Sequence, residues 1–418
     1  MDKITWLSRK AILISGVTLN LLSLLIIKYS NFVLGLAGSS LKLDIIIPAG
    51  LSFYVFQSTT YIIDRYRNET GPEKNILKYA LFVSFFPCLL SGPIERSKNF
   101  LCQTDVYDNK KFDPVRIKKG LMYMLWGYFF KLVIVPRMLI LTDTIFGSYE
   151  EMAGSILVLG LFAYSFQIYC DFAGYSFIAL GCAGILGYEV TNNFRQPYLA
   201  RSIAEHWRRW HISLSTWFRD YMYIPLGGNR KGEFRKYINI MLVFLVSGLW
   251  HGADLTFLVW GGLHGGYQVI GYIRDNIFRK LGIKIKKPGD AGYGRLHDIF
   301  RIVITYLLVT STWVPFLSAN VKDMSGIYSA IVQRFDISSL TDGTVFSLGL
   351  GVDNLVFVIG AVVILIIVEL ACEKKQCDIS GLFENVRFPL RWSFYYLLII
   401  MIIFSLNLSS KEFLYQSF

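Results

Sequence analysis

The sequence predicts an all-α polytopic membrane protein, and two observations support this fold class. Of its 418 residues, 54% are hydrophobic and only 17% are charged, and the mean hydropathy is +0.45. A soluble domain is rarely more than half apolar. Long apolar stretches with few charges are typical of membrane-spanning helices. We expect seven such spans, at residues 11–27, 45–63, 120–135, 156–187, 301–316, 355–372 and 392–406.

The charges of the loops predict how these spans are oriented. Loops 201–236 and 274–301 each hold eight Lys and Arg against three Asp and Glu, and loop 92–119 holds seven against four. Loops 142–155 and 317–354 are acidic instead. Because Lys and Arg are enriched in cytoplasmic loops, we expect the basic loops inside and the acidic loops outside.

Two shorter apolar pieces complete this topology. Residues 79–90 and the segment around His251 are expected to enter the membrane and return on the same side, which satisfies all five loop charges. The N-terminus then lies inside and the C-terminus outside. Segment 156–187 is long for one helix, and if it crosses twice the topology downstream inverts.

A single integral membrane domain over residues 1–418 is the simplest organisation, because no repeat or linker divides the chain. Lys3, Arg9 and Lys10 precede the first apolar run, but no small-residue cleavage site follows it. We therefore expect an uncleaved membrane anchor. The six cysteines form no CxxC pair, so neither a disulfide framework nor a zinc site is indicated.

Residues 200–228 predict an amphipathic helix at the cytoplasmic interface. Apolar side chains recur there at spacings of three and four, while the arginines fall mainly on other faces. Pro225 and the glycine pair at 227–228 would end the helix. A simple anchor has no need of a histidine on its aromatic face. That face comprises Trp207, Trp210, His211, Leu214, Trp217, Phe218 and Tyr221.

Four of the five histidines fall within residues 205–265. An ionisable residue at membrane depth indicates a functional site, although each histidine could equally be a structural hydrogen-bonding group. His251 is the strongest catalytic candidate. Gly248 and Gly252 beside it permit a close approach of the backbone, and a buried neutral imidazole can accept a proton. His211 is the second candidate.

The remaining polar groups of this region have less specific interpretations. His264, in GGLHGG, equally suits helix packing through small residues. His297 lies in a charged loop and is expected to be solvated. Asp254 has three open roles: it could orient His251, cap the returning helix or reach water.

Several reaction classes lack their sequence patterns. There is no HExxH motif or Cys/His cluster for a metal, no GxSxG elbow and no Walker loop. The loop GGNRKG (227–232) could still hold a phosphate-bearing group, such as the nucleotide end of coenzyme A, through Arg230 and Lys231. Alternatively it is only a basic cytoplasmic loop.

Long motifs in the chain resemble the membrane-bound O-acyltransferase family, in the bacterial branch of the alginate O-acetylation membrane protein. The central ones are HWRRWHISLSTWFRDYMYIPLGGNRKG and SGLWHGADLTFLVWGGLHG. Others are PAGLSFYVFQSTTYIIDRYR, YALFVSFFPCLLSGPIER, YCDFAGYSFIALGCAGILGYEVTNNFRQPY and the C-terminal FLYQSF. The resemblance covers nearly the whole chain.

This resemblance implies a ring of tilted transmembrane and re-entrant helices around a central tunnel. An acyl group would enter as a cytoplasmic thioester and pass to a hydroxyl across or within the membrane. His251 matches the family's near-invariant histidine, the expected general base, and His211 matches a second histidine of the same tunnel. In this branch the acyl group is usually relayed to an extracytoplasmic partner, often a Ser-His-Asp acetyltransferase.

We therefore expect an O-acyltransferase of the inner or plasma membrane that serves O-acetylation of an extracellular or cell-wall polysaccharide. Acetyl-CoA is the expected donor, with no permanently bound cofactor, no metal and no nucleic-acid partner. Besides the two catalytic histidines, the expected substrate-binding residues are Trp210, Arg208, Arg209, Arg219, Asp220, Arg230, Lys231, Trp250, Asp171 and Asn193.

The chain departs from the family pattern in three places. It begins at what resembles the family's third helix, so the usual N-terminal helical hairpin is expected to be missing. Phe177 stands where an acid is common, which leaves Asp171 as the only acid of that motif. Leu317, after Phe316, stands where arginine is more usual, so the outer end of the tunnel and partner docking remain open.

Two other functions stay open. A D-alanyl-transfer membrane protein would share the fold and take its acyl group from an acidic carrier, although IPLGGNRKG favours the acetylation branch. A transporter or polysaccharide-export subunit would use the buried polar groups as a path, but such proteins often show two related halves and no such symmetry is evident.

Overall fold

The fold is all-helical in a computed structural model that describes residues 8–107, 111–283, 294–384 and 386–406. No β-strand occurs in these ranges. The first half contains α1 (Arg9–Leu36), α2 (Leu51–Tyr66), α3 (Ile76–Ser84), α4 (Phe86–Leu89), α5 (Ser97–Asp105), α6 (Pro114–Tyr128), the π-helical η2 (Phe129–Ile134), α7 (Val135–Gly147), α8 (Gly154–Ile185) and η3 (Pro197–Leu199). The second half contains α9 (Ile203–Arg209), α10 (Ile212–Phe218), the π-helical η4 (Arg219–Tyr223), α11 (Glu233–His251), α12 (Leu255–Lys280), α13 (Arg295–Ser311), α14 (Trp313–Leu317), α15 (Val321–Gln333), η5 (Ile337–Leu340), η6 (Thr344–Ser347), α16 (Val352–Lys375), α17 (Ile379–Leu382) and α18 (Phe388–Ser405).

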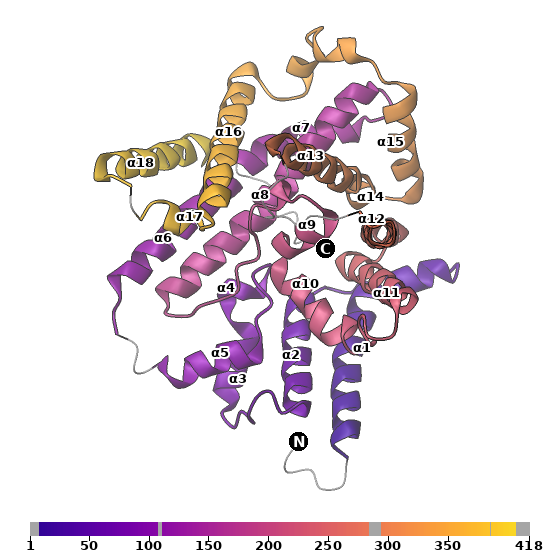
Figure 1. Ribbon diagram of the computed structural model, residues 1–418, viewed down its shortest axis with the longest axis vertical. Helices are drawn as coiled ribbons and strands as arrows, with labels where there is room; N and C mark the ends of the chain where they lie inside the picture. The colour runs from indigo at the N-terminus through magenta and orange to yellow at the C-terminus, as the bar shows by residue number, and fades with distance from the viewer. Residues whose placement is uncertain (1–7, 108–110, 284–293, 385, 407–418) are drawn as a thin grey trace.

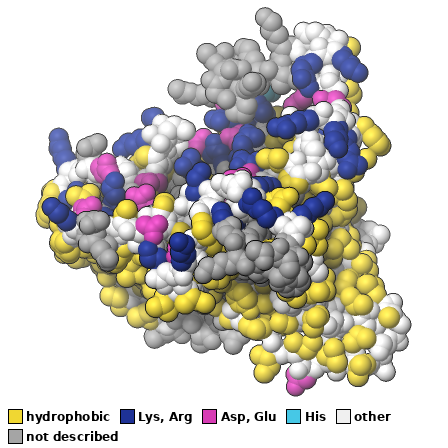
Figure 2. Space-filling view, turned by 90° about the horizontal axis from the view of Figure 1, so that it is seen from below, with side chains coloured by type: hydrophobic (Ala, Val, Ile, Leu, Met, Phe, Trp, Pro, Cys, Tyr) yellow, Lys and Arg dark blue, Asp and Glu magenta, His cyan; other side chains and the backbone are white. Residues whose placement is uncertain are grey.

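Six helical segments of the described chain are long and apolar enough to cross a membrane, which confirms a multi-pass membrane protein. They are Arg9–Leu36, Pro114–Gly147, Gly154–Ile185, Leu296–Leu317, Val352–Lys375 and Phe388–Ser405. Figure 2 shows one face of the molecule on which Lys and Arg side chains gather, with Asp and Glu among them and hydrophobic surface alongside. A protein that meets both lipid and water presents surfaces of these two kinds.

The predicted span at 45–63 is wrong as a full-length helix. Helix α2 begins only at Leu51 and has 16 residues, and the chain before it is not helical. At 1.5 Å per residue this helix is about 24 Å long, short of the ~30 Å hydrocarbon core. Segment 156–187, in contrast, is a single uninterrupted helix, α8, despite its glycines and Asp171.

Helix α8 lies at the centre of the fold, with α6 and α7 packed along it (Figure 1). Glycines allow this close packing. A Cβ on Gly127 would lie 2.5 Å from the carbonyl oxygen of Gly174, and one on Gly181 would lie 2.3 Å from that of Gly120. The two backbones therefore touch directly, as small residues permit in membrane helices.

Helices α11 and α12 form a tight hairpin that carries His251 at its turn. A Cβ on Gly248 would lie 2.2 Å from the carbonyl oxygen of Phe257, and one on Gly261 would lie 2.3 Å from that of Phe244. The segment 79–90 also breaks into two short helices, α3 and α4, which meet at Phe85. Neither of those is long enough to cross a bilayer.

The single interfacial helix predicted over 200–228 is wrong in two respects. The chain forms two short helices, α9 and α10, because His211 between them adopts a left-handed conformation with φ +44°. The aromatic residues of this segment are also buried inside the protein rather than at its rim, since Trp207, Trp210 and Trp217 are all less than 10% exposed. The spacing of three and four residues thus marks core positions.

Candidate functional site

His251 is the last residue of α11, where the chain turns towards α12. It is only 3% exposed and aromatic rings surround it. Its imidazole meets Trp260 edge-on with 5.0 Å between ring centroids, and Phe316 with 5.6 Å. An apolar enclosure of this kind disfavours the imidazolium, so the neutral ring is available to accept a proton.

Asp254 caps the returning helix. It is the N-cap residue of α12, and its Oδ1 accepts a hydrogen bond from the backbone N–H of Thr256 at 2.9 Å. Of the three roles left open by the sequence, capping is the one that this contact supports. This cap at Asp254, three residues after His251, fixes the start of α12.

His211 lies at the break between α9 and α10 and is fully buried. Its ring packs edge-on against Phe172 of α8, with 4.6 Å between centroids. Within the described residues neither ring nitrogen has a hydrogen-bond partner. Burial lowers the pKa of His211 to about 3, so the ring is neutral at physiological pH.

Trp250 brings the two candidate histidines together. Its indole lies 4.9 Å from the ring of His251 and 6.1 Å from that of His211, measured between centroids. The structure therefore places His251, His211 and Trp250, three of the residues selected from the sequence, in one cluster. They come from α11 and from the α9–α10 break.

An inner cavity of about 440 Å³ is lined by residues of α9, α10, η4, α11 and α12. Arg208 and Arg219, from a loop that the charge pattern predicts to be cytoplasmic, line it together with Ser247 and Ile212. Ser247 lies one helical turn before His251, so both share a face of α11. The other lining residues are Ala204, Trp207, Leu214, Ser215, Thr216, Phe218, Tyr223, Ile240, Val243, Phe244, Gln268 and Tyr272.

An outer cavity of about 550 Å³ has Phe316, whose ring contacts that of His251, in its wall. Its walls include Asp143 and Ser318, from loops that the acidic charge pattern predicts to be outside, and also Asp254 and Phe316. His251 itself lines neither cavity: its ring contacts Phe316 in the wall of this one, and it lies one helical turn from Ser247 in the wall of the other. One cavity is lined by arginines and the other by carboxylates.

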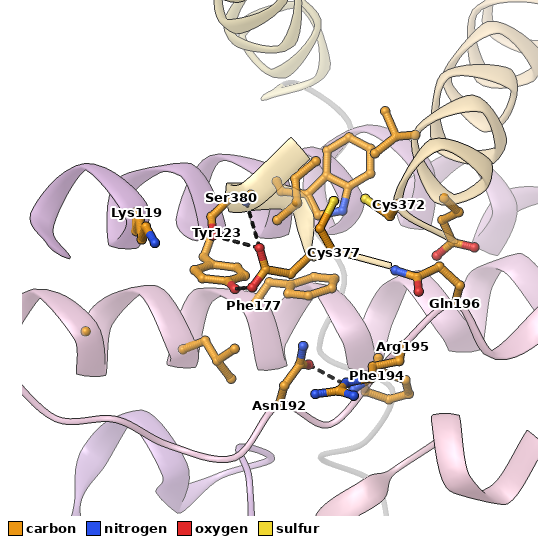
Figure 3. A pocket seen from close by; sticks show the side chains of 18 of the residues that line it. Lys119, Tyr123, Phe177, Asn192, Phe194, Arg195, Gln196, Cys372, Cys377 and Ser380 are labelled. Atoms are coloured by element: carbon orange, nitrogen blue, oxygen red, sulfur yellow. Dashed lines mark hydrogen bonds between the residues drawn. The ribbon is translucent and has the colours of Figure 1, made fainter. Parts of the chain in front are cut away.

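A third cavity, of about 860 Å³, lies between α6, α8, α16 and α17 (Figure 3). No histidine lines it. Several of its charged side chains pair with one another. The Tyr123 hydroxyl donates to Asp378 at 2.5 Å, and Lys119 forms an ion pair with Glu384 at 2.9 Å. Sequence reasoning missed this cavity, because hydropathy predicts residues 120–135 to be an ordinary span.

Three predicted substrate-binding residues have partners within the protein, and one of them, Arg209, also lines the 860 Å³ cavity. Arg209 forms ion pairs with Glu205 at 2.6 Å and with Glu373 at 2.7 Å. Asp171 forms an ion pair with Lys131 of η2. Asn193 accepts a hydrogen bond from the Ser213 backbone N–H at 3.1 Å and so holds the start of α10.

The other predicted residues divide between the cavities, the surface and the core. Asp220 forms ion pairs with Arg219 at 2.8 Å and with Arg96 at 3.3 Å. Arg230 and Lys231 are exposed and line none of the three cavities. Trp210 is 2% exposed and packs in the aromatic core.

The remaining histidines have structural or solvent-exposed positions. His264 donates from Nε2 to Thr312 Oγ1 at 2.9 Å and accepts at Nδ1 from the Trp207 indole at 3.3 Å. His206 donates to the carbonyl oxygen of Pro197 at 3.2 Å. His297 is exposed. In the described residues, no group of three or more His, Cys, Asp and Glu side chains could hold a metal ion.

Sequence reasoning missed the residues of α1 that reach this site. The Lys28 ammonium group donates to the carbonyl oxygens of Trp250 at 2.7 Å and of His251 at 3.1 Å. The Tyr29 hydroxyl donates to the carbonyl oxygen of Leu249. These contacts link residues more than 200 positions apart, and in the sequence Lys28 reads only as the end of an apolar run.

The chain is similar to a known protein family and to several named relatives. Residues 67–287, more than half of the chain, match the profile of the membrane-bound O-acyltransferase family. Over 350 residues the chain is 36% identical to the probable alginate O-acetylase AlgI of Pseudomonas aeruginosa, covering 81% of this chain and 64% of that protein. Over 355 residues it is 32% identical to the peptidoglycan O-acetyltransferase of Helicobacter pylori, covering 78% and 65%.

A more distant relative is the teichoic acid D-alanyltransferase of Bacillus subtilis. The identity is 26% over 272 residues, covering 62% of this chain and 66% of that protein. The chain thus spans less than two thirds of the length of these relatives. The family match and the buried histidine in its long motif lead to one identification. This chain belongs to the membrane-bound O-acyltransferase family.

Proposed function

We propose that this protein is a membrane O-acetyltransferase of the inner or plasma membrane. It takes an acetyl group from a cytoplasmic thioester and delivers it for O-acetylation of an extracellular or cell-wall polysaccharide. The observation that carries this proposal is the position of His251, a buried imidazole that contacts Phe316 in the wall of the outer cavity and lies one helical turn from Ser247 in the wall of the arginine-lined inner cavity. The named activities of the O-acetylase relatives support the same chemistry.

His251 is the general base in this proposal. The imidazole accepts the proton of the acceptor hydroxyl, whose oxygen attacks the thioester carbonyl. The carbon–sulfur bond then breaks, and the leaving thiolate takes a proton back from the imidazolium. General base catalysis of this kind contributes ~10²–10⁴-fold to the rate. The aromatic rings around His251 exclude water and so limit hydrolysis of the thioester.

His211 serves as a second polar group of the reaction path. Its two ring nitrogens are buried and have no protein partner within the described residues. A buried polar group without a partner loses free energy, and a ligand that hydrogen-bonds to it recovers that loss. We assign His211 the role of orienting the thioester or the acceptor hydroxyl beside Trp250.

Acetyl-CoA is the donor in this proposal, and the inner cavity is its entrance. Arg208 and Arg219 line the cavity and can bind phosphate oxygens of the donor. The opposite wall, with Phe244 and Val243, is apolar and suits the pantetheine chain. The acetyl group would reach His251 past Ser247.

The acceptor side involves an extracytoplasmic acetyltransferase or acyl-relay protein and a polysaccharide. The outer cavity opens among Asp143, Leu317 and Ser318, in segments that the charge pattern predicts to lie outside. A hydroxyl supplied there meets the face of His251 opposite the donor. This arrangement requires no crossing of the membrane by coenzyme A itself.

The test is acetyl transfer by the protein in sealed vesicles with acetyl-labelled donor outside, on the cytoplasmic face. We expect release of free thiol and labelled product for the wild type and for His297→Asn, a change at an exposed histidine. His251→Ala should reduce transfer at least ~10²-fold while the protein stays in the membrane. Full activity of that variant would remove His251 from the mechanism.

The same assay separates two alternatives. D-alanyl transfer, the activity named for the more distant relative, would require a D-alanyl carrier protein as donor and leave acetyl-CoA intact. A transporter or export subunit would leave the label on its donor altogether.

A further inference from the structure

The C-terminal end of α11, which presents His251, is held by two consecutive residues of α1. The last carbonyls of a helix have no donor within the helix and need partners from elsewhere. Lys28 donates to the carbonyl oxygens of Trp250 at 2.7 Å and His251 at 3.1 Å. Tyr29 donates to that of Leu249. Three successive carbonyls are thereby bonded to α1.

Lys28 occupies an unusual position for a lysine. Helix α1, which carries Lys28, is one of the six candidate membrane spans. Nearby on this helix, Leu25 and Ile26 are more than half exposed on an apolar surface. A charged side chain inside a membrane helix is costly and is retained where it has a specific partner. Here the partner is the negative end of the α11 dipole, which attracts a cation. The ammonium group also lies 6.0 Å from the Trp250 ring centroid.

We propose that Lys28 is a positioning residue for His251: it fixes the helix end that carries the imidazole, and its charge favours the neutral, proton-accepting ring. This inference rests on the proposed role of His251 as general base. Tyr29 contributes to the same anchorage without a charge. The lysine acts through His251 and takes no part in the chemistry itself.

The charge of Lys28 acts alongside the other titratable groups that face His251. These are His211 from the α9–α10 break and His264 on α12, while Asp254 begins α12 and is engaged in its cap. Both histidines are buried and neutral in this setting. Lys28 is therefore the group among them that brings a positive charge close to the α11 terminus.

Three variants test the inference in the vesicle assay. Lys28→Met keeps the length of the side chain but removes its charge and donors, and Lys28→Arg keeps both. Tyr29→Phe is the matched control, because it removes one hydrogen bond to the same helix end without changing the charge. We expect Lys28→Met to lower kcat about 10- to 100-fold with little change in the donor KM, as a displaced catalytic group does. Lys28→Arg should recover most of the rate.

The pH profile of kcat distinguishes an effect of the Lys28 charge on His251 from a general stabilisation of the fold by Lys28. Without the cation His251 holds a proton at higher pH, so the acid limb of kcat should move upward by on the order of one pH unit in Lys28→Met. Tyr29→Phe should leave the limb in place. If Lys28→Met retains more than half of the wild-type kcat, or loses activity with an unshifted limb and no rescue by arginine, the inference is wrong.

Two further measurements keep the test independent of folding and of the proposed function. If Lys28→Met does not accumulate in the membrane, Lys28→Gln carries the same comparison, because it retains donors without the charge. NMR titration of His251 in detergent, assigned with His251→Asn, reports the effect of Lys28 directly. An unshifted titration in the uncharged variant overturns the inference, whereas a wild type that transfers no acetyl group overturns the proposed function instead.

Discussion

Replacing Gly261 with alanine should separate α11 from α12 and disable the site without touching a histidine. The added Cβ would lie 2.3 Å from the carbonyl oxygen of Phe244, 3.0 Å from its carbonyl carbon and 3.3 Å from Cα of Leu245. All three atoms are backbone, so no side chain can rotate away. Ordinary contact begins at 3.4 Å, and the two helices must therefore move apart by about 1 Å.

This displacement translates into a large loss of activity and a modest loss of stability. A misplacement of about 1 Å in a catalytic group costs ~10²-fold in rate, and overpacking costs about 1–3 kcal/mol of folding free energy. We expect Gly261→Ala to transfer acetyl groups ~10²-fold more slowly in the vesicle assay. Its apparent melting temperature in detergent should fall by a few degrees.

The adjacent residue supplies the control. A Cβ on Gly262 would meet only Leu245 Cδ2, at 3.9 Å, which is ordinary van der Waals contact. Gly262→Ala carries the same chemical change one position along α12 and should keep nearly full activity. Equal behaviour of the two variants would refute the argument that backbone contact between α11 and α12 positions His251.

Three other predictions concern the cavity, the helix cap and pH. Arg208→Glu should raise the donor KM by ~10- to 100-fold with little effect on kcat, because a phosphate contact becomes repulsive. Arg230→Glu, on the exposed loop, should leave the donor KM unchanged. Steady-state kinetics with varied donor concentration measure both variants. Asp254→Ala should lower the folding free energy by ~0.5–2 kcal/mol through loss of the α12 cap, and Asp254→Ser should recover most of it in thermal unfolding. Because burial lowers the pKa of His211 to about 3 while the unfolded chain keeps the ordinary value of 6.5, its contribution to stability is complete above pH 6.5 and is lost as the pH falls towards 3. Melting temperatures between pH 7.5 and 5 should thus fall less steeply in His211→Asn than in the wild type.

Most of the membrane-spanning segments were predictable from the sequence, because hydropathy reports directly which segments prefer lipid. It failed at 45–63, where apolar residues precede α2 without forming a helix. Hydropathy records the preference of side chains for an apolar environment, and it does not record whether the backbone there is helical. Hydropathy also cannot tell whether segment 156–187 crosses once or twice. Its glycines suggest a break, but in the structure they pack against α6 within one continuous helix, α8.

The candidate site was predictable in its central residue but not in its surroundings. His251 stood out because a histidine among glycines and tryptophans is costly without a use. The break at His211 could not be foreseen, because a left-handed conformation is uncommon for a residue other than glycine and leaves no mark on spacing. The ion pair of Arg209 with Glu373 joins distant parts of the chain, and a local reading offers only the charge of each.

The length of helix α8 has a consequence for the site. Its 32 residues make it about 48 Å long, whereas the hydrocarbon core is only ~30 Å thick. Most of this length is buried inside the protein, so neighbouring helices rather than lipid cover it, and α8 fits the membrane by a steep inclination. Because α8 also carries Phe172 against His211, the inclination that its neighbours impose sets where that ring meets the histidine. A change in how α6 or α7 packs along α8 would therefore reach the site.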